Sequence, residues 1–341
     1  MARPQYPGRV TLQDIARETG YTVNTVSHAL KNKSDISPAT REKIQQVAQR
    51  MGYVRNYVAS SLRSGRTKII AVILGGMSNP YYALMSDEIQ KEASSLGYSL
   101  IILCSRDDPD LEYSAAETAV SRQVDGVLLF PGKEYSRTEE LLRASGTPFI
   151  LMSRYTDADT ADTAVCDEVQ GAYLAVSHLL EQGHRKVAML SAGYVPFASE
   201  KRTEGFLKAC ADAGIAGAEK YVAVRGGNED ILKQLLAWRA EGVTGIFSFC
   251  DVEAWNIITL LNGQGIRVPE DMGIVGFDDI QGRYSFPAPL CTVSFDIPRM
   301  CAEAVHLLRR RIHHEDLARQ ETVYPVRLVC RGSCGCGAKK K

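Results

Sequence analysis

Hydrophobic positions change their spacing near residue 68. Before that point they recur every three or four residues in three short stretches, at 11–19, 22–30 and 38–51, which is the spacing of amphipathic helices. After it, short continuous runs of aliphatic residues alternate with helical patterns of roughly 12–18 residues. The pattern therefore predicts a small helical segment followed by a larger α/β body.

The three helical patterns begin and end at residues that favour helix ends. Thr11, Thr22 and Ser37 precede them as N-caps, and Asp14 stands at the capping-box position of the first. Gly20 permits a tight turn between the first and second. Two helices joined by such a turn and followed by a third form a helix-turn-helix, whose second helix enters the major groove of DNA. A three-helix bundle that only packs is the alternative interpretation.

The body contains two sets of about four buried-strand patterns, with helical patterns such as 82–96 and 168–182 between them. Strand–helix alternation predicts doubly wound parallel sheets covered on both faces. Two similar sets predict two lobes, with a ligand held between them at the carboxyl ends of the strands. The predicted strands are 69–74, 100–104, 127–130 and 149–152, then 187–190, 222–224, 246–249 and 274–277.

Charge divides the chain at the same place. The first 66 residues carry a net charge of +7 and the remainder −7, although the whole chain is neutral. A basic head is typical of a segment that contacts phosphate. The start lacks the apolar stretch of a secretory signal, and no apolar run is long enough for a membrane span. We therefore expect a cytoplasmic protein with no membrane partner.

The head resembles the lac repressor (LacI/GalR) family in many identities at fixed spacings. They are Val10-Thr11-Leu12-Gln13-Asp14-Ile15-Ala16, Gly20, Thr25-Val26-Ser27, Ser37-Pro38-Ala39-Thr40-Arg41 and Gly52-Tyr53. The body resembles the family's core in 183–187, 202–206, 268–271 and 276–279. The resemblance implies an α/β protein with an N-terminal all-α helix-turn-helix headpiece and a two-lobed periplasmic-binding-protein-like core of doubly wound parallel sheets.

The resemblance also implies the order of domains. A DNA-binding domain spans 9–55, a hinge helix or linker 56–67, an effector-binding and dimerisation core 68–331 and a tail 332–341. Within the core, the N-lobe is expected at about 68–164 plus 295–324, and the C-lobe at about 165–294 plus 325–331. The chain should cross between the lobes near Ala164, Phe295 and Pro325.

On the second helix, the resemblance assigns base reading to Val23, Asn24 and His28. An asparagine can bond an adenine edge bidentately, and a valine can contact a thymine methyl group. His28 stands where the family usually has arginine, so the preferred operator sequence stays open. Phosphate contacts, which position the protein without specifying sequence, are expected from Thr11, Thr22, Thr25 and Ser27.

The segment after Tyr53 resembles the family's hinge helix, which places a leucine in the minor groove. Leu62 occupies that position, and such a wedge can unstack a base step and kink the duplex. Arg55 replaces the usual proline and Ser60 a common arginine. A plain linker with an incidental leucine is the alternative interpretation.

Effector contacts are expected where strands of the core end. Aromatic side chains such as Tyr81 and Tyr82 can stack on a ring, and Arg154 and Asp278 can bond hydroxyl groups. For Arg202 a structural brace is an equally good interpretation. Ser153, Cys250 and Phe295 replace residues with more hydrogen-bonding capacity, which predicts a more apolar pocket than a typical sugar site. The predicted contacts are Asn79, Tyr81, Tyr82, Ser153, Arg154, Ser199, Arg202, Cys250, Asp251, Asp278 and Phe295.

The main catalytic motifs do not occur in the sequence, so we predict neither an enzyme nor a cofactor. The nine cysteines are odd in number and lie mostly in apolar runs, as expected of reduced, buried thiols. Cys330, Cys334 and Cys336 lie close together, but without Cys-x-x-Cys spacing or an evident fourth ligand nearby. We therefore predict no metal site, with zinc binding or a redox pair as the alternative.

Together these features predict a homodimeric transcription regulator, a repressor of pseudo-palindromic operator DNA. The resemblance implies that a carbohydrate-like effector between the lobes controls its operator affinity. A sugar carrier or receptor that uses the core alone is the second hypothesis, and a sugar- or nucleotide-processing enzyme the third. The basic head disfavours the carrier.

Overall fold

The computed structural model describes residues 10–54, 65–133, 135–154, 161–193, 196–282, 289–315 and 317–336. The chain divides into two compact units, Met1–Thr67 and Lys68–Lys341. None of the helices in these described ranges is long and apolar enough to cross a membrane. The predicted hinge residues Arg55, Ser60 and Leu62 lie outside the described ranges.

The N-terminal unit contains three helices that begin and end as predicted. Thr11 and Asp14 form a reciprocal capping box, in which the Asp14 carboxylate accepts from the Thr11 backbone N–H at 3.0 Å. Gly20 has a φ of 74°, which allows the left-handed turn after the first helix. The helices are α1 (Leu12–Thr19), α2 (Val23–Leu30) and α3 (Pro38–Met51), and they enclose the buried side chains of Ile15, Val26 and Ile44.

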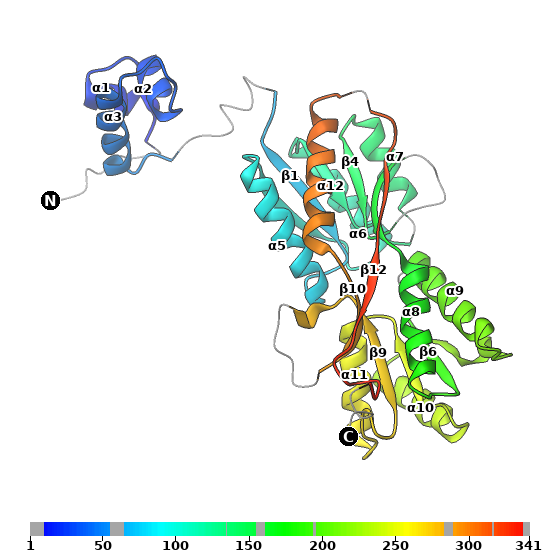
Figure 1. The fold of residues 1–341 in the computed structure, drawn as a ribbon. Helices are drawn as coiled ribbons and strands as arrows, with labels where there is room; N and C mark the ends of the chain where they lie inside the picture. The colour runs from blue at the N-terminus through cyan, green and yellow to red at the C-terminus, as the bar shows by residue number, and fades with distance from the viewer. Residues whose placement is uncertain are drawn as a thin grey trace. The chain divides into compact units, whose positions relative to one another are not determined.

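The first sheet of the core is parallel throughout, with the strand order β11-β5-β4-β3-β1-β2. Ile70 and Val72 pack with α5 and α12, whereas Ala71 and Ile73 pack with α6 on the opposite face. Both faces are covered, which explains the continuous apolar run of β1 (Figure 1). The strands are β1 (Ile69–Leu74), β2 (Ser99–Cys104), β3 (Gly126–Leu129), β4 (Phe149–Met152), β5 (Asp162–Cys166) and β11 (Glu321–Tyr324). The helices are α5 (Pro80–Ser95), α6 (Pro109–Ser121), α7 (Ser136–Ala144) and α12 (Ile297–Ile312).

The second sheet has the order β12-β10-β9-β8-β6-β7, and β12 alone pairs antiparallel, with β10. Met189 and Phe247 pack on the side of α8 and α9, and Leu190 and Ile246 on the side of α10 and α11. The strands are β6 (Val187–Ser191), β7 (Val222–Val224), β8 (Gly245–Ser248), β9 (Gly273–Phe277), β10 (Cys291–Phe295) and β12 (Val326–Val329). The helices are α8 (Glu168–Glu181), α9 (Pro196–Asp212), α10 (Asn228–Ala240) and α11 (Asp251–Gly263).

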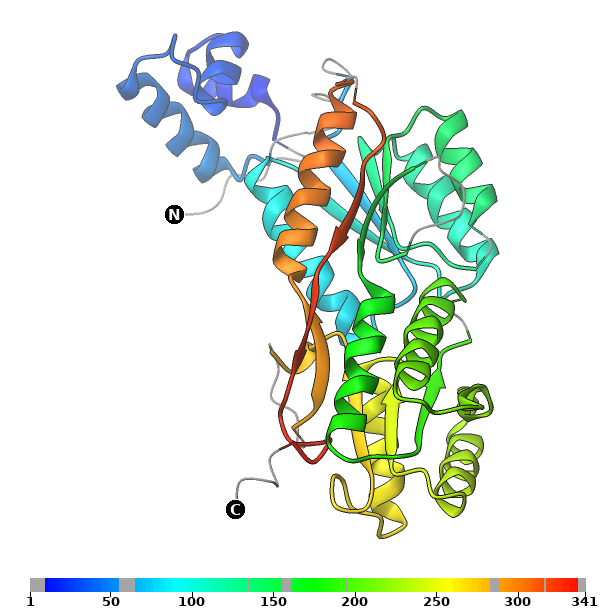
Figure 2. The ribbon, with the colours of Figure 1, turned by 45° about the vertical axis from the view of Figure 1, so that its right-hand side comes forward.

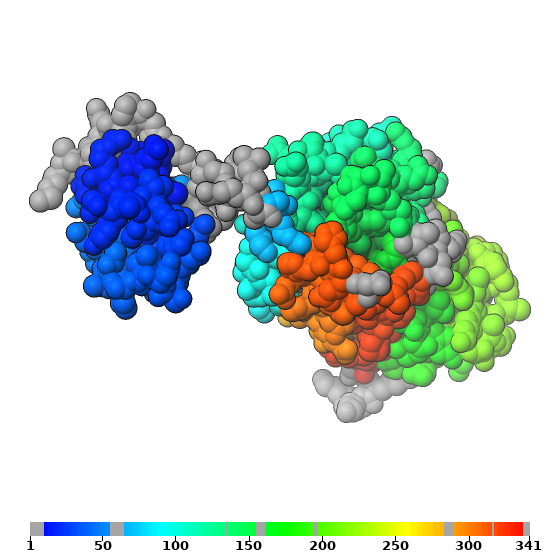
Figure 3. Space-filling view, turned by 90° about the horizontal axis from the view of Figure 1, so that it is seen from above, coloured from blue at the N-terminus to red at the C-terminus, as the bar shows by residue number. Residues whose placement is uncertain are grey.

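Each sheet has six strands rather than the expected four, because sequence analysis missed β5, β10, β11 and β12. These strands flank the three passages of the chain between the lobes. They are short and carry polar residues such as Asp162, Thr292 and Arg327, so no apolar run marks them. Figure 2 shows the last two, in red, running from one lobe to the other past α12 (orange). In the space-filling view α12 reaches the surface beside α5 (cyan) (Figure 3).

The last described residues pack against the C-lobe, although sequence analysis assigned them to the tail. The Ser333 hydroxyl donates to the Ile274 carbonyl and accepts from the Cys291 N–H, both at 2.7 Å. Cys334 is fully buried. Small side chains of this kind can be buried without an apolar run, so the segment 332–336 belongs structurally to the C-lobe.

Candidate ligand cleft and DNA-binding surface

A cleft of about 590 Å³ lies between the two lobes of the core. Its walls come from the carboxyl ends of strands in both sheets, including β1, β2, β3, β4, β8 and β9. This is the expected position for a ligand in open parallel sheets, and the volume is in the range of small-molecule sites.

Nine of the eleven predicted effector residues line the cleft. The Ser199 hydroxyl instead donates to the Ala192 carbonyl, and Ser199 is not among the lining residues. Asp251 also lies outside the lining, because its buried carboxylate accepts from the Thr292 hydroxyl at 2.5 Å and the Ile280 N–H at 3.0 Å. The nine are Asn79, Tyr81, Tyr82, Ser153, Arg154, Arg202, Cys250, Asp278 and Phe295.

The N-lobe wall is built from tyrosines, a serine and an arginine. The Tyr81 and Ser153 hydroxyls are hydrogen-bonded to each other, and the rings of Tyr81 and Tyr82 meet edge to face at 5.5 Å. Arg154 donates to the Tyr82 hydroxyl at 3.0 Å and to the Asp107 carboxylate at 3.4 Å. Burial raises the pKa of Tyr81 well above its ordinary value, so its hydroxyl stays neutral.

The tyrosines reach the cleft because of how α5 begins. Asn79 caps this helix, and its side-chain oxygen accepts from the Tyr81 N–H at 3.0 Å. Pro80 occupies the first helical position, where its lack of an N–H costs nothing. Tyr81 and Tyr82 follow in the first turn, directly beyond the carboxyl end of β1. The sequence Asn-Pro-Tyr-Tyr thus fixes both a helix start and one wall of the cleft.

The C-lobe wall centres on Arg202, whose charge is already satisfied by protein groups. Its guanidinium donates to Glu168 at 2.6 Å and to the Phe249 carbonyl, and lies 3.9 Å from Asp278. The guanidinium carbon lies 3.6 Å from the ring centroid of Phe277 and 4.4 Å from that of Phe249. These contacts favour the brace interpretation of Arg202.

Asp278 is the buried carboxyl that faces the cleft from the end of β9. Burial raises its pKa well above the ordinary value, the Arg202 cation opposes that rise, and the carboxylates of Asp251 and Glu168 add to it. A carboxyl in this state can either donate to or accept from a ligand hydroxyl. Asp278 therefore suits a ligand rich in hydroxyl groups.

Several lining residues were missed by sequence analysis. Arg106 and Asp107 follow the end of β2, so the strand-end argument would have found them had it been applied to that strand. Glu168 begins α8 directly after β5, a strand that sequence analysis did not predict. Phe130 and Phe249 were predicted as final strand residues, yet their side chains line the cleft.

The predicted base-reading residues lie on α2 of the headpiece. Val23 is 42% exposed and Asn24 is also exposed, whereas His28 is half-buried. The His28 Nδ1 lies 2.6 Å from the Asp35 carboxylate, which orients the imidazole, and this hydrogen bond lowers the pKa of Asp35. Of the predicted phosphate contacts, Thr11 and Thr22 are exposed, and Thr25 and Ser27 are half-buried.

A capped helix-turn-helix unit and a two-lobed core with a ligand-sized cleft define the class of DNA-binding proteins that respond to a small molecule. Comparison with known proteins agrees. Residues 11–56 match the family of bacterial regulatory proteins, lacI family, and residues 176–334 match the periplasmic binding protein-like domain. The HTH-type transcriptional regulator DegA of Bacillus subtilis is 32% identical over 335 residues, which cover 95% of this chain and 98% of DegA. The chain belongs to the LacI family and is a DNA-binding transcriptional regulator with a ligand-binding core.

Two solved structures show the same architecture. The transcriptional regulator CelR in complex with cellobiose is 25% identical, with a TM-score of 0.70 over 95% of this chain and 100% of CelR. The lac repressor dimer bound to operator and the anti-inducer ONPF is 22% identical, with a TM-score of 0.81 over 96% of this chain and 99% of the repressor. The second likeness shows the fold, a helical headpiece and two α/β lobes with mostly parallel strands.

Proposed function

We propose that this regulator is a homodimeric repressor of a pseudo-palindromic operator, controlled by a carbohydrate or carbohydrate derivative in the cleft. The N-lobe wall is the observation that carries the choice of ligand. It combines aromatic rings with hydroxyl groups and an arginine, which together suit the apolar faces and polar edge of a sugar ring. The cellobiose complex of CelR supports the same class of ligand.

In this proposal the two lobes hold different parts of the ligand. Arg154 donates to ligand hydroxyls from the N-lobe, and Asp278 bonds them from the C-lobe. The Tyr81 and Phe295 rings, whose centroids lie 6.5 Å apart, together form an apolar surface for one face of the sugar ring. The thiol of Cys250 and the ring of Phe295 add apolar surface, so we expect a sugar with an apolar or deoxy substituent to bind better than the parent sugar.

On the DNA side, we propose that Val23, Asn24 and His28 read base edges. The Asp35 carboxylate is hydrogen-bonded to the His28 Nδ1, so the Nε2 atom is the ring nitrogen that is left to contact a base. Thr11, Thr22, Thr25 and Ser27 contact phosphates, and Leu62 is the minor-groove wedge of the hinge.

The experiment has two linked parts. Selection from random duplexes should give a palindromic operator, and a panel of sugars should be screened for thermal stabilisation of the purified protein. A ligand from the screen should change operator affinity about 5- to 150-fold, and operator should change ligand affinity by the same factor. A ligand that binds equally well with and without operator would contradict the regulatory part of the proposal.

Matched variants separate the two sites. Asn24→Ala should weaken specific operator binding by about 1–3 kcal/mol, whereas Gln49→Ala on α3 should leave it unchanged in gel shift. Arg154→Ala should weaken sugar binding without changing operator affinity in the absence of sugar. Arg137→Ala, at an exposed position on α7, is its control. If Asn24→Ala bound operator like wild type, the assignment of α2 to base reading would be wrong.

A further inference from the structure

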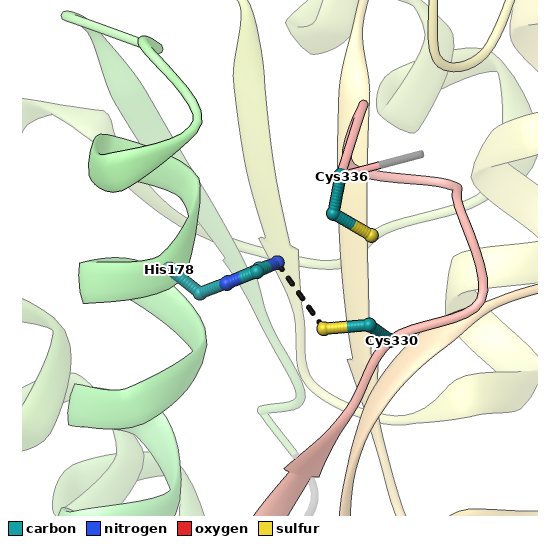
Figure 4. Close-up of side chains that lie close together, drawn as sticks. All are labelled: His178, Cys330 and Cys336. Carbon is teal, nitrogen blue, oxygen red and sulfur yellow. Dashed lines mark hydrogen bonds between the residues drawn. The ribbon is translucent and has the colours of Figure 1, made fainter. Parts of the chain in front are cut away.

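Four cysteine thiols and one histidine imidazole lie together on the C-lobe, where the segment after β12 packs against it. His178 lies in the last turn of α8, and Cys291 begins β10. Cys330, Cys334 and Cys336 follow β12 in the segment that packs against this lobe. Figure 4 shows the Cys330 sulfur directed at the imidazole of His178, with Cys336 on the same side of α8. None of these five residues belongs to the ligand cleft.

The ligating atoms lie within a few ångströms of one another. The Nε2 atom of His178 is 3.1 Å from the Cys334 sulfur and 3.5 Å from the Cys330 sulfur. The Cys291 sulfur is 3.2 Å from that of Cys334 and 3.6 Å from that of Cys336. His178, Cys330 and Cys336 form one group whose donor atoms all lie within 4.8 Å of one another, and Cys291, Cys334 and Cys336 form a second.

These separations match the edges of a tetrahedral zinc site. Bond lengths of about 2.3 Å to sulfur and about 2.0 Å to nitrogen place neighbouring ligand atoms roughly 3.5–3.8 Å apart. Three separations chain together His178, Cys334, Cys291 and Cys336. They are 3.1, 3.2 and 3.6 Å, and they differ from that range by at most about half an ångström. Small side-chain rotations would therefore bring four donors around one ion.

The surroundings favour the ligating form of these groups. The Cys291 sulfur accepts from the backbone N–H groups of Arg331 and Gly332, both at 3.2 Å, and such donors stabilise a thiolate. The other imidazole nitrogen of His178 lies 4.0 Å from the Glu181 carboxylate, which is the usual kind of outer partner for a metal-bound histidine. His184 contacts the Cys334 carbonyl at 3.3 Å and so holds the cysteine loop.

We propose that Cys291, Cys334, Cys336 and His178 bind one structural Zn²⁺ ion. Cys291 and Cys334 are fully buried, His178 is nearly so and Cys336 is half-buried, whereas Cys330 is exposed. The first four residues therefore supply the four protein ligands that a structural zinc site needs. The ion joins α8, the start of β10 and the end of the chain. Its loss should therefore destabilise the C-lobe, independently of any ligand in the cleft.

The test is the zinc content of the full-length, untagged protein, purified with reductant and equilibrated with ZnSO₄. We expect inductively coupled plasma mass spectrometry to find about one zinc ion per chain. The melting temperature should fall when the zinc is chelated and recover when Zn²⁺ is added back. Replacement by Co²⁺ should give the visible spectrum of a tetrahedral thiolate site. Cys336→Ser should lower zinc affinity at least tenfold, and His178→Gln should do the same.

Two control variants sharpen the result. Cys104→Ser removes an exposed thiol in the N-lobe and should keep wild-type zinc content. Cys330→Ser should also keep it, because Cys330 is outside the proposed set. Three results would overturn the proposal: a reduced protein that binds no zinc, zinc binding unchanged by Cys336→Ser and His178→Gln, or a purified protein lighter by two hydrogen atoms because Cys291 and Cys334 form a disulfide.

Discussion

The two walls of the cleft each contain one buried arginine, but the two side chains are held differently. Arg154, on the N-lobe wall, is 7% exposed, and its carboxylate partner is Asp107 at 3.4 Å, which still reaches solvent. Arg202, on the C-lobe wall, is 5% exposed and lies 2.6 Å from the buried Glu168 and 3.9 Å from the buried Asp278.

On this difference rests the proposal that Arg154 binds the ligand and Arg202 is structural. A buried cation needs a partner, and Arg202 has two carboxylates, a carbonyl and two aromatic rings around it. Arg154 has a neutral phenol, the Pro131 carbonyl and a single, partly solvated carboxylate. A ligand can therefore replace the contacts of Arg154 at little cost, whereas replacing those of Arg202 would expose buried charge.

The largest expected effect is that of Arg202→Ala on stability. Removing this cation leaves Glu168 buried without its counter-charge, which typically costs about 3–5 kcal/mol. Urea unfolding of the core, followed by circular dichroism, measures the free energy of unfolding. Arg137→Ala, which breaks an exposed ion pair with Asp110 and a contact with the Tyr113 ring, should change it little. A loss for Arg202→Ala no greater than for this control would contradict the brace role.

The second expected effect is a pH dependence of the free energy of unfolding, caused by the buried carboxyl of Asp251 behind the C-lobe wall. Burial raises the pKa of this carboxyl from an ordinary 3.8 to about 7. Between these values the folded protein keeps the proton and the unfolded chain does not, so rising pH lowers the free energy of unfolding. Below 3.8 both states are protonated, and above about 7 both are charged, so the contribution no longer changes.

Asp251→Asn removes this titration. The free energy of unfolding of wild type, relative to the variant, should fall between pH 4 and pH 7 by up to about 4 kcal/mol, at about 1.4 kcal/mol per pKa unit. Urea titrations at several pH values measure the difference, and a constant offset from altered hydrogen bonding does not affect its slope. A difference that is flat or rises with pH would show that the folded carboxyl is already charged.

The smallest stability effect is expected for Arg154→Ala. The variant loses hydrogen bonds to Tyr82, Asp107 and the Pro131 carbonyl but leaves Asp107 in contact with solvent, so the cost should be about 1.5–3 kcal/mol. Its affinity for the sugar found by screening should nevertheless fall at least about tenfold, as measured by calorimetry at a temperature where the variant is folded. If Arg202→Ala lost sugar affinity and Arg154→Ala kept it, the roles of the two arginines would be the reverse of those proposed.

Features that depend on neighbours in sequence were predictable. The caps at Thr11, Thr22 and Ser37 form as predicted, because a cap involves groups only two or three residues away. The apolar runs of the inner strands were equally clear, because both faces of those strands are buried. The strand-end argument also placed Tyr81, Arg154 and most other predicted contacts in the cleft, since parallel strands bring their carboxyl ends together.

The four strands that flank the passages between the lobes, β5, β10, β11 and β12, could not be predicted in this way. β5 and β10 are completely buried, yet Asp162 and Thr292 interrupt their apolar pattern. Asp162 is acceptable there because its carboxylate accepts from Arg311 at 2.7 and 2.9 Å. The partner is 149 residues away along the chain, so no local pattern identifies the pair.

The sequence by itself determined the helix-turn-helix, the alternating α/β core, the family and most of the cleft, because these follow from local periodicity, caps and spacing. Tertiary structure alone decided that Arg202 is enclosed by Glu168 and Asp278 while Arg154 faces a more solvated partner. It also brought His178 and Cys291 to the C-terminal Cys334 and Cys336, the set that we propose to bind zinc. His178 lies more than 150 residues before them, and Cys291 about 40, and only the order of strands in the C-lobe sheet brings these side chains together.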